Sequence, residues 1–128
     1  WDCIEHLPHP RQALVQLAQR LRPGGLLALS TGDVTSLCAR WSGPRWHLYN
    51  FPEHLFFFSP QALRLLLARA GCRVLRVRRE VNWVNSGYIA ERLGKRRGGR
   101  ADAGRAGGPR LPATLGDVLG VYAVKVST

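Results

Sequence analysis

A short apolar run between two turns constrains this chain more than any other feature. Leu26–Leu29 is apolar at every position, follows Pro23-Gly24-Gly25 and precedes Ser30-Thr31-Gly32. The alternation of a half-solvated strand is absent, and such short runs are typical of strands buried on both faces. Strands of this kind belong to parallel or mixed sheets covered by helices. Because ligands bind at the carboxyl ends of such strands, we expect Thr31 to border a site.

Two amphipathic helices are predicted around this strand. From Arg11 to Leu21 the apolar positions follow i, i+3, i+4, i+7 spacing, at Leu14, Leu17, Ala18 and Leu21. Ser59-Pro60 begins the second helix, with serine as the N-cap and proline at the first helical position, and Gly71 ends it. A shorter helix, capped by Asp33, is predicted to run to Trp41.

Two further strands and one loop complete the expected order. Cys72–Glu80 alternates apolar residues with arginines, as a strand with one solvated face near a sheet edge does. Asp117–Val126 has the length and the Val and Tyr content of a terminal strand. A short helix is expected around Ile89–Leu93. Residues 94–112 are rich in Arg and Gly with almost no large apolar side chain, and are predicted to be a disordered loop.

Composition bounds the class of protein. The chain has 128 residues, a net charge of +11 and no methionine, and it begins at Trp1, so we expect a piece of a longer domain. All but Lys95 and Lys125 of the 19 basic residues are arginines, as a GC-rich coding sequence also produces. The charge is therefore interpreted as a solvated surface. The cysteines are odd in number, which favours free thiols and a cytoplasmic location.

Four segments, in order, resemble one family. Trp1–Pro10 resembles the E-H-L-x-D-P stretch of class I S-adenosylmethionine-dependent methyltransferases, and Leu21–Gly25 resembles their L-R-P-G-G turn. Pro52–Ser59 is similar to the P-P-E-H-L-x-F-F-S segment of the small-molecule branch, and Leu115–Asp117 to the family's L-G-D ending. The resemblance covers nearly the whole chain except the Arg/Gly-rich loop.

The resemblance implies an α/β fold, the carboxyl-terminal half of a Rossmann-like seven-stranded sheet, with Leu26–Leu29 as strand 5 and an antiparallel strand 7. Residues 1–128 would form part of one domain, with the strand at Leu26 at or next to an open edge. S-adenosyl-L-methionine is the implied cofactor. The glycine-rich loop that holds it in the family is not found in a strand–helix context here. We therefore expect the piece alone to be inactive.

Candidate site residues come from the resemblance and from an aromatic loop at Gly32–Phe58. The sets are Trp1, Asp2 and Glu5 for the cofactor, Thr31, Asp33, Trp46 and Tyr49 for the acceptor, and His6, His47 and His54 as catalytic bases. Glu5 and His6 alternatively cap a helix entry, Asp33 serves as an N-cap, His54 forms a structural hydrogen bond, and Phe56–Phe58 pack on the sheet.

Other functions stay open beside this one. Quinone-pathway O-methyltransferases with a similar E-x-x-E-H arrangement bind a divalent ion there, and Asp2, Glu5 and His6 match it, although we assign no metal site. The partner is expected to be a small-molecule methyl acceptor, without a membrane span or nucleic acid. The alternatives are a basic module that binds nucleic acid or anionic surfaces through Arg92–Arg110, and a degenerate subunit.

Overall fold

The computed structural model of the chain describes residues 1–80, 82–85, 110–113 and 116–126. The chain divides into two compact units, residues 1–80 with 115–128, and residues 81–114. The larger unit carries the predicted helices and the strands beside them. None of the helices among the described residues is both long and apolar enough to span a bilayer.

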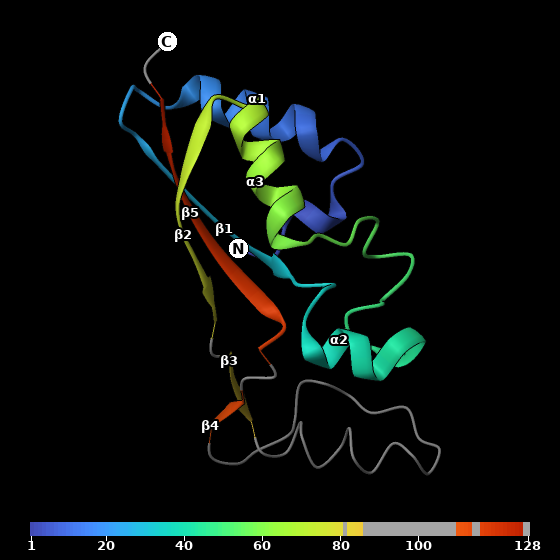
Figure 1. Ribbon diagram of the computed structural model, residues 1–128. Coiled ribbons are helices and arrows are strands. Elements are labelled where there is room, and N and C mark those ends of the chain that lie inside the picture. Colours follow the sequence, from blue (N-terminus) through green and yellow to red (C-terminus); the bar gives the residue numbers. More distant parts are fainter. Residues whose placement is uncertain (81, 86–109, 114–115, 127–128) are drawn as a thin grey trace. The chain divides into compact units, whose positions relative to one another are not determined.

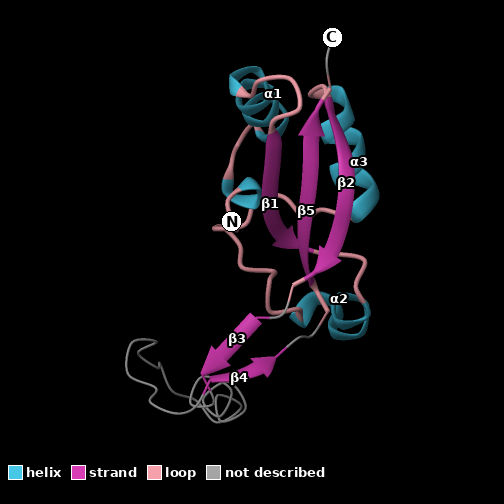
Figure 2. Cartoon of the chain, turned by 90° about the vertical axis from the view of Figure 1, so that its left-hand side faces the viewer, coloured by secondary structure: helices cyan, strands magenta, loops and turns pink. Residues whose placement is uncertain are grey.

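The sheet of the larger unit is built around the last strand of the chain. β5 (Val118–Lys125) lies between β1 (Leu26–Gly32) and β2 (Cys72–Arg79) and is antiparallel to both (Figure 2). Val121 pairs with Leu29 on one side and with Val77 on the other. The predicted α/β class and the two outer strands are confirmed, and the register of β2 shifts between Val74 and Arg76.

The first strand is less buried than its sequence predicts. β1 is an edge strand of the described sheet, as expected for the open edge. Leu26 is 69% exposed, whereas Ser30 and Thr31 at the other end are buried. The prediction of burial on both faces is therefore wrong at Leu26 and Ala28, which are both exposed, because the described helices cover only one face of the sheet.

Two helices cover one face of the sheet. α1 (Pro10–Arg20) and α3 (Pro60–Arg69) lie on the same side of β1, β5 and β2 (Figure 1). Their buried side chains meet the inward residues of β5 in one core, formed by Leu14, Ala18, Leu63, Leu67, Leu119, Val121 and Ala123. The predicted stripes are confirmed except at Leu17, which is 48% exposed.

The short helices follow local capping. Ile4–His6 and Gly43–Arg45 form single 3₁₀ turns, and α2 spans Leu37–Ser42. Ser36 caps α2, since its hydroxyl accepts a hydrogen bond from the Ala39 amide at 3.0 Å. The prediction of Asp33 as the cap is wrong. Its carboxylate instead accepts bonds from the amide and hydroxyl of Thr35, and this turn moves the helix start past Asp33.

The smaller unit contains a pair of strands. β3 (Asn82–Asn85) and β4 (Arg110–Ala113) are antiparallel, with Asn85 opposite Arg110. Residues 110–112 therefore belong to a strand, and the predicted disordered loop 94–112 is wrong at this end, because backbone pairing with Trp83–Asn85 orders it. The rest of that loop and the helix predicted at Ile89–Leu93 lie outside the described residues.

Candidate active site

The amino-terminal segment is attached to the buried end of β1 through one serine. The Asp2 amide donates to the Ser30 hydroxyl oxygen at 2.9 Å, and that hydroxyl donates to Asp2 Oδ1 at 2.7 Å. Asp2 adopts φ 48°, and its amide also reaches the Ser30 carbonyl at 3.2 Å. Trp1 is 70% exposed and contacts the Tyr122 ring edge-on. Asp2 is therefore fixed at the carboxyl end of β1, and its predicted role in cofactor binding stays a prediction.

Glu5 links the same segment to the aromatic loop. Its carbonyl oxygen accepts hydrogen bonds from the amides of Leu55 and Phe56, at 2.8 and 3.2 Å. Its side chain is buried, and Oε2 has no hydrogen-bond partner. A buried carboxylate oxygen without a donor is costly unless a cation or a donor from a ligand satisfies it.

His6 and His54 lie edge-to-face beside Glu5, with ring centroids 4.7 Å apart. The two Nδ1 atoms lie 2.7 Å from backbone carbonyl oxygens, of Glu53 for His6 and of Leu48 for His54. Since a carbonyl oxygen only accepts, each Nδ1 carries a proton, and Nε2 is the nitrogen with a lone pair when the ring is neutral. The structural hydrogen bond expected of His54 is confirmed.

These three residues could hold a divalent cation. One donor atom each of Glu5, His6 and His54 lies within 4.8 Å of the others. Metal-binding histidines commonly donate their second ring N–H to a carbonyl, as both do here. Asp2 is not part of this group, because its carboxylate is taken by Ser30. The structure therefore replaces the Asp2 of the sequence-derived metal set with His54.

Ring contacts run through the aromatic loop. The series His6, His54, Phe57, Tyr49, Trp46 and His47, here called the aromatic ladder, has neighbouring centroids 4.7–6.4 Å apart. Phe58 joins the hydrophobic core, as predicted, whereas Phe56 and Phe57 stay 38% and 37% exposed. The ladder keeps an otherwise aperiodic loop in one arrangement and connects the two histidine groups of the site.

Asp117 is a site residue that the sequence interpretation did not single out. This residue directly precedes β5 and is buried. Its carbonyl oxygen accepts a hydrogen bond from the Asp33 amide at 2.7 Å, and its Oδ2 accepts one from Trp46 Nε1 at 2.9 Å. His47 Nδ1 lies 3.6 Å from the same oxygen. The only sequence signal was the acid of the L-G-D segment ahead of a strand.

The predicted acceptor residues fall into two groups. Thr31, Asp33 and Trp46 are almost fully buried, at 1%, 1% and 2% exposure, and they support the site from inside. Tyr49 is 41% exposed, and the His47 side chain is 29% exposed. Tyr49 and His47 are therefore accessible from solvent, while the acceptor-binding and catalytic roles stay predictions.

Cys38 stands beside Asp117 at the start of α2. Burial raises the pKa of its thiol, and the negative charge of Asp117 and a hydrogen bond to that carboxylate raise it further. A hydrogen bond from Ser42 acts in the opposite direction. The thiol is therefore protonated at neutral pH and is a poor nucleophile there.

The described residues could form only one side of a cofactor site. A cavity of about 150 Å³ lies between the amino-terminal segment, α1 and β1, lined by Trp1, Ile4, Leu14, Leu29 and Ser30 among others. Pockets for ligands the size of a nucleoside cofactor enclose roughly 300–1,000 Å³. The cavity is mostly apolar, and Ser30, which lines it, donates its hydroxyl hydrogen bond to the Asp2 carboxylate.

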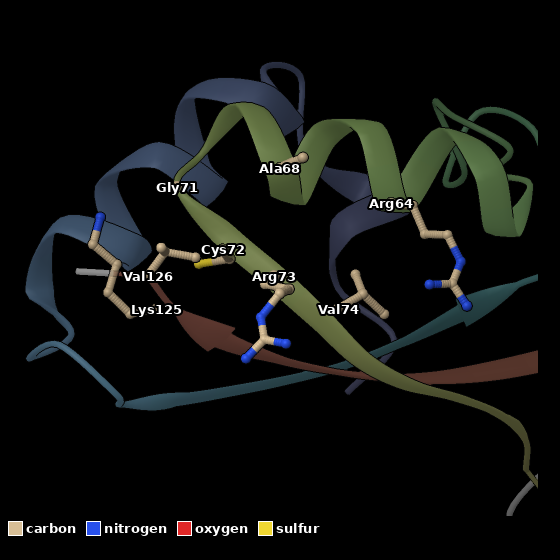
Figure 3. Close-up of a pocket in the computed structure, with 8 residues that line it drawn as sticks. All are labelled: Arg64, Ala68, Gly71, Cys72, Arg73, Val74, Lys125 and Val126. Atoms are coloured by element: carbon tan, nitrogen blue, oxygen red, sulfur yellow. The ribbon is translucent and has the colours of Figure 1, made fainter. Parts of the chain in front are cut away.

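A second, basic pocket lies elsewhere on the larger unit, between α3 and β2 (Figure 3). It measures about 520 Å³, and Arg64, Arg73 and Lys125 are its charged lining residues. Among the described residues no acidic side chain lines it, so the charged groups of its described lining are all positive. None of the predicted site residues borders this pocket.

These features define an α/β protein whose acidic amino-terminal segment meets an aromatic loop at the carboxyl end of an edge strand. The chain belongs to the methyltransferase domain family. The family model described as "Methyltransferase domain" matches residues 1–77, from the amino-terminal segment into β2.

A solved structure supports the fold. The chain is similar to a SAM-dependent methyltransferase from Thermotoga maritima, described as a possible histamine N-methyltransferase, with a TM-score of 0.57 and 18% identity. The match covers 95% of this chain and 52% of that one, so the chain spans about half the length of that protein. No curated protein matches this chain.

Proposed function

We propose that this chain takes part in the transfer of a methyl group from S-adenosyl-L-methionine to a small-molecule acceptor. The observation that carries the proposal is the family match over residues 1–77. The antiparallel β5 between β1 and β2 adds support, since it matches strands 5, 7 and 6 of the seven-stranded sheet that the resemblance implies. The P-E-H-L-F segment of the small-molecule branch supports the acceptor class.

Trp1, Asp2 and Glu5 would face the cofactor. The Asp2–Ser30 bonds fix a carboxylate at the end of β1, and a carboxylate in such a place can accept hydrogen bonds from ribose hydroxyls. Since the described residues form only one wall, recognition of the whole cofactor requires further sequence. The 128-residue chain alone is then inactive or nearly so.

Tyr49 and His47 would face the acceptor. Methyl transfer requires an acceptor heteroatom in line with the sulfonium, a group that takes its proton, and exclusion of water. His47 is the best-placed of the three catalytic histidines, because it is partly exposed and its Nδ1 faces a buried carboxylate. Asp117 would orient the ring and stabilise the imidazolium, which leaves Nε2 to take the proton.

A divalent ion would be held by Glu5, His6 and His54. The orphaned Glu5 oxygen and the two carbonyl-bonded imidazoles fit a hard-to-borderline cation. Such an ion lowers the pKa of a bound hydroxyl. In that case His6 and His54 act as ligands and His47 remains the base.

Labelled transfer tests the proposal. The complete natural protein is titrated with S-adenosylhomocysteine by calorimetry and then given methyl-labelled cofactor with a panel of phenols and amines. Binding of S-adenosylhomocysteine is expected, and its absence overturns the proposal. H47Q should lower kcat with little change in cofactor affinity, whereas H9Q, at an exposed histidine before α1, is the matched control.

Three free cysteines agree with the cytoplasmic location that we propose.

A second candidate is the binding of an anionic surface or nucleic acid, favoured by the pocket of Arg64, Arg73 and Lys125. Such binding weakens steeply as salt rises. Absence of salt-sensitive affinity for a phosphate-bearing polymer removes this candidate, and affinity that survives R64Q/R73Q exchange excludes the pocket as the binding site. The Arg/Gly-rich loop of the sequence interpretation lies mostly outside the described residues.

A further inference from the structure

Three metal-ligating side chains from separate parts of the chain meet behind the aromatic loop. Cys38 lies in α2, His47 in the loop after Gly43–Arg45, and Asp117 in the turn before β5. One donor atom of each lies within 4.8 Å of the other two. This Cys–His–Asp group is separate from the Glu5, His6 and His54 group. The proposed methyl transfer uses His47 and Asp117, but it gives Cys38 no role.

The spacing of two of the atoms suits coordination better than hydrogen bonding. His47 Nδ1 lies 3.6 Å from Asp117 Oδ2. That separation is longer than a good hydrogen bond. Two ligands of one tetrahedral zinc ion, bonded at about 2.0–2.1 Å, lie about 3.3–3.4 Å apart. A shift of a few tenths of an ångström would therefore bring both atoms onto one ion.

The outer contacts of the group hold its ligands in place. Trp46 Nε1 donates to the same carboxylate oxygen, and the Asp117 carbonyl accepts from the Asp33 amide. Ligating carboxylates in metal sites are typically supported by such partners.

Burial gives the group one closed side and one open side. Asp117 is buried, whereas Cys38 and His47 are partly exposed. An ion could enter from the Cys38 and His47 side and keep a water molecule there as its fourth ligand. Sulfur, nitrogen and oxygen donors together select a borderline-soft transition metal, and they disfavour Mg²⁺ and Ca²⁺.

We propose that Cys38 Sγ, His47 Nδ1 and Asp117 Oδ2 form a zinc-binding site with one open coordination position. Binding converts the Cys38 thiol into a zinc-bound thiolate and releases one proton to solvent, without oxidation or reduction. The site does not depend on the proposed methyl transfer. Where His47 serves as the base of that reaction, bound zinc occupies it and inhibits transfer.

Cobalt substitution tests the site directly, because Co²⁺ takes the place of zinc and reports thiolate ligation in its spectrum. The 128-residue protein is titrated with Co²⁺, and the sulfur-to-cobalt charge-transfer band is followed, with subsequent displacement by Zn²⁺. C38S and D117N remove ligands, and C3S is the matched control because Cys3 is an exposed free cysteine. H54Q removes a ligand of the other group and leaves this one intact.

The band is expected in the wild type, C3S and H54Q, and absent in C38S. Loss of an outer-shell partner typically weakens metal binding by about 10–100-fold, and D117N, which removes a ligand, should weaken Zn²⁺ binding by more than that. W46F, which removes a hydrogen bond to Asp117, should weaken it by about 10-fold. Circular dichroism of each variant verifies folding, and a C38S protein that is unfolded is replaced by C38A. A band that persists without Cys38, or its absence in folded wild-type protein, overturns the proposal.

Discussion

The Trp46 indole nitrogen donates a 2.9 Å hydrogen bond to Oδ2 of Asp117, a residue 71 positions later in the chain. Both side chains are almost fully buried. This bond attaches the aromatic loop to the turn that begins the central strand, and it fixes the position of His47 next to Trp46. The geometry of the candidate site therefore depends on a contact between the two halves of the sequence.

Replacement of Trp46 by Phe should destabilise the protein by about 1–3 kcal/mol, because it leaves a buried carboxylate with one donor fewer. Urea unfolding followed by circular dichroism measures the change. Trp41→Phe is the matched control, since Trp41 is 95% exposed and its loss should have almost no effect. Equal effects of the two substitutions would contradict a structural role for the buried bond.

Ser30→Ala should loosen the amino-terminal segment without unfolding the sheet. The Ser30 hydroxyl both accepts from the Asp2 amide and donates to the Asp2 carboxylate. The loss of about 1 kcal/mol per hydrogen bond predicts amide exchange roughly 5–30-fold faster at Asp2–Glu5. Hydrogen exchange by mass spectrometry measures it, with β5 peptides as the internal reference. Unchanged protection of the first residues would refute the expectation.

Ser59→Ala should cost about 1 kcal/mol of unfolding free energy, since the Ser59 hydroxyl accepts from the Ala62 amide at 3.1 Å as the N-cap of α3. Ser59→Asp keeps a capping oxygen and should restore most of the stability. Thermal or urea unfolding of the Ser59→Ala and Ser59→Asp variants measures both changes in unfolding free energy. If the Asp variant is as unstable as the Ala variant, capping is not the cause.

Alkylation of Cys38 by iodoacetamide should require a higher pH than alkylation of an ordinary thiol, because burial and Asp117 raise its pKa. Asp117→Asn removes the charge and should lower the midpoint pH. Because the Cys38 pKa is higher in the folded than in the unfolded protein, the neutral thiol contributes its full stabilisation below the ordinary thiol pKa. That contribution declines as the pH rises through the raised pKa of the folded protein. Peptide mass spectrometry of metal-free protein gives the profile, with Cys3 as the exposed reference. A midpoint at or below that of Cys3 would contradict the raised pKa.

Local patterns were sufficient to predict the regular elements. The apolar spacing of Leu63 and Leu67 marks the buried side of α3, and Ser59-Pro60 marks its start, because both signals arise within one helix. β5 was predicted from its own Val and Tyr content. The family resemblance placed these elements in order.

Contacts between distant residues could not be derived in the same way. Asp33 and Ser36 are both good capping residues, and only the Asp33–Thr35 turn decides in favour of Ser36. The meeting of His6 with His54 depends on backbone bonds from Glu5 to Leu55 and Phe56, which no spacing encodes. Pairing of Arg110–Ala113 with Asn82–Asn85 likewise came from a partner far along the chain.

The central strand is also synthesised after both of its neighbours. β1 and β2 share no pairing with each other, and both form their ladders on β5. During translation α1 and α3 can form from local signals, while the edges of β1 and β2 that face β5 stay unpaired until Val118–Lys125 emerges. A stop codon before Val118 would therefore leave these two strand edges open, and the nascent chain needs protection from self-association until β5 has been made.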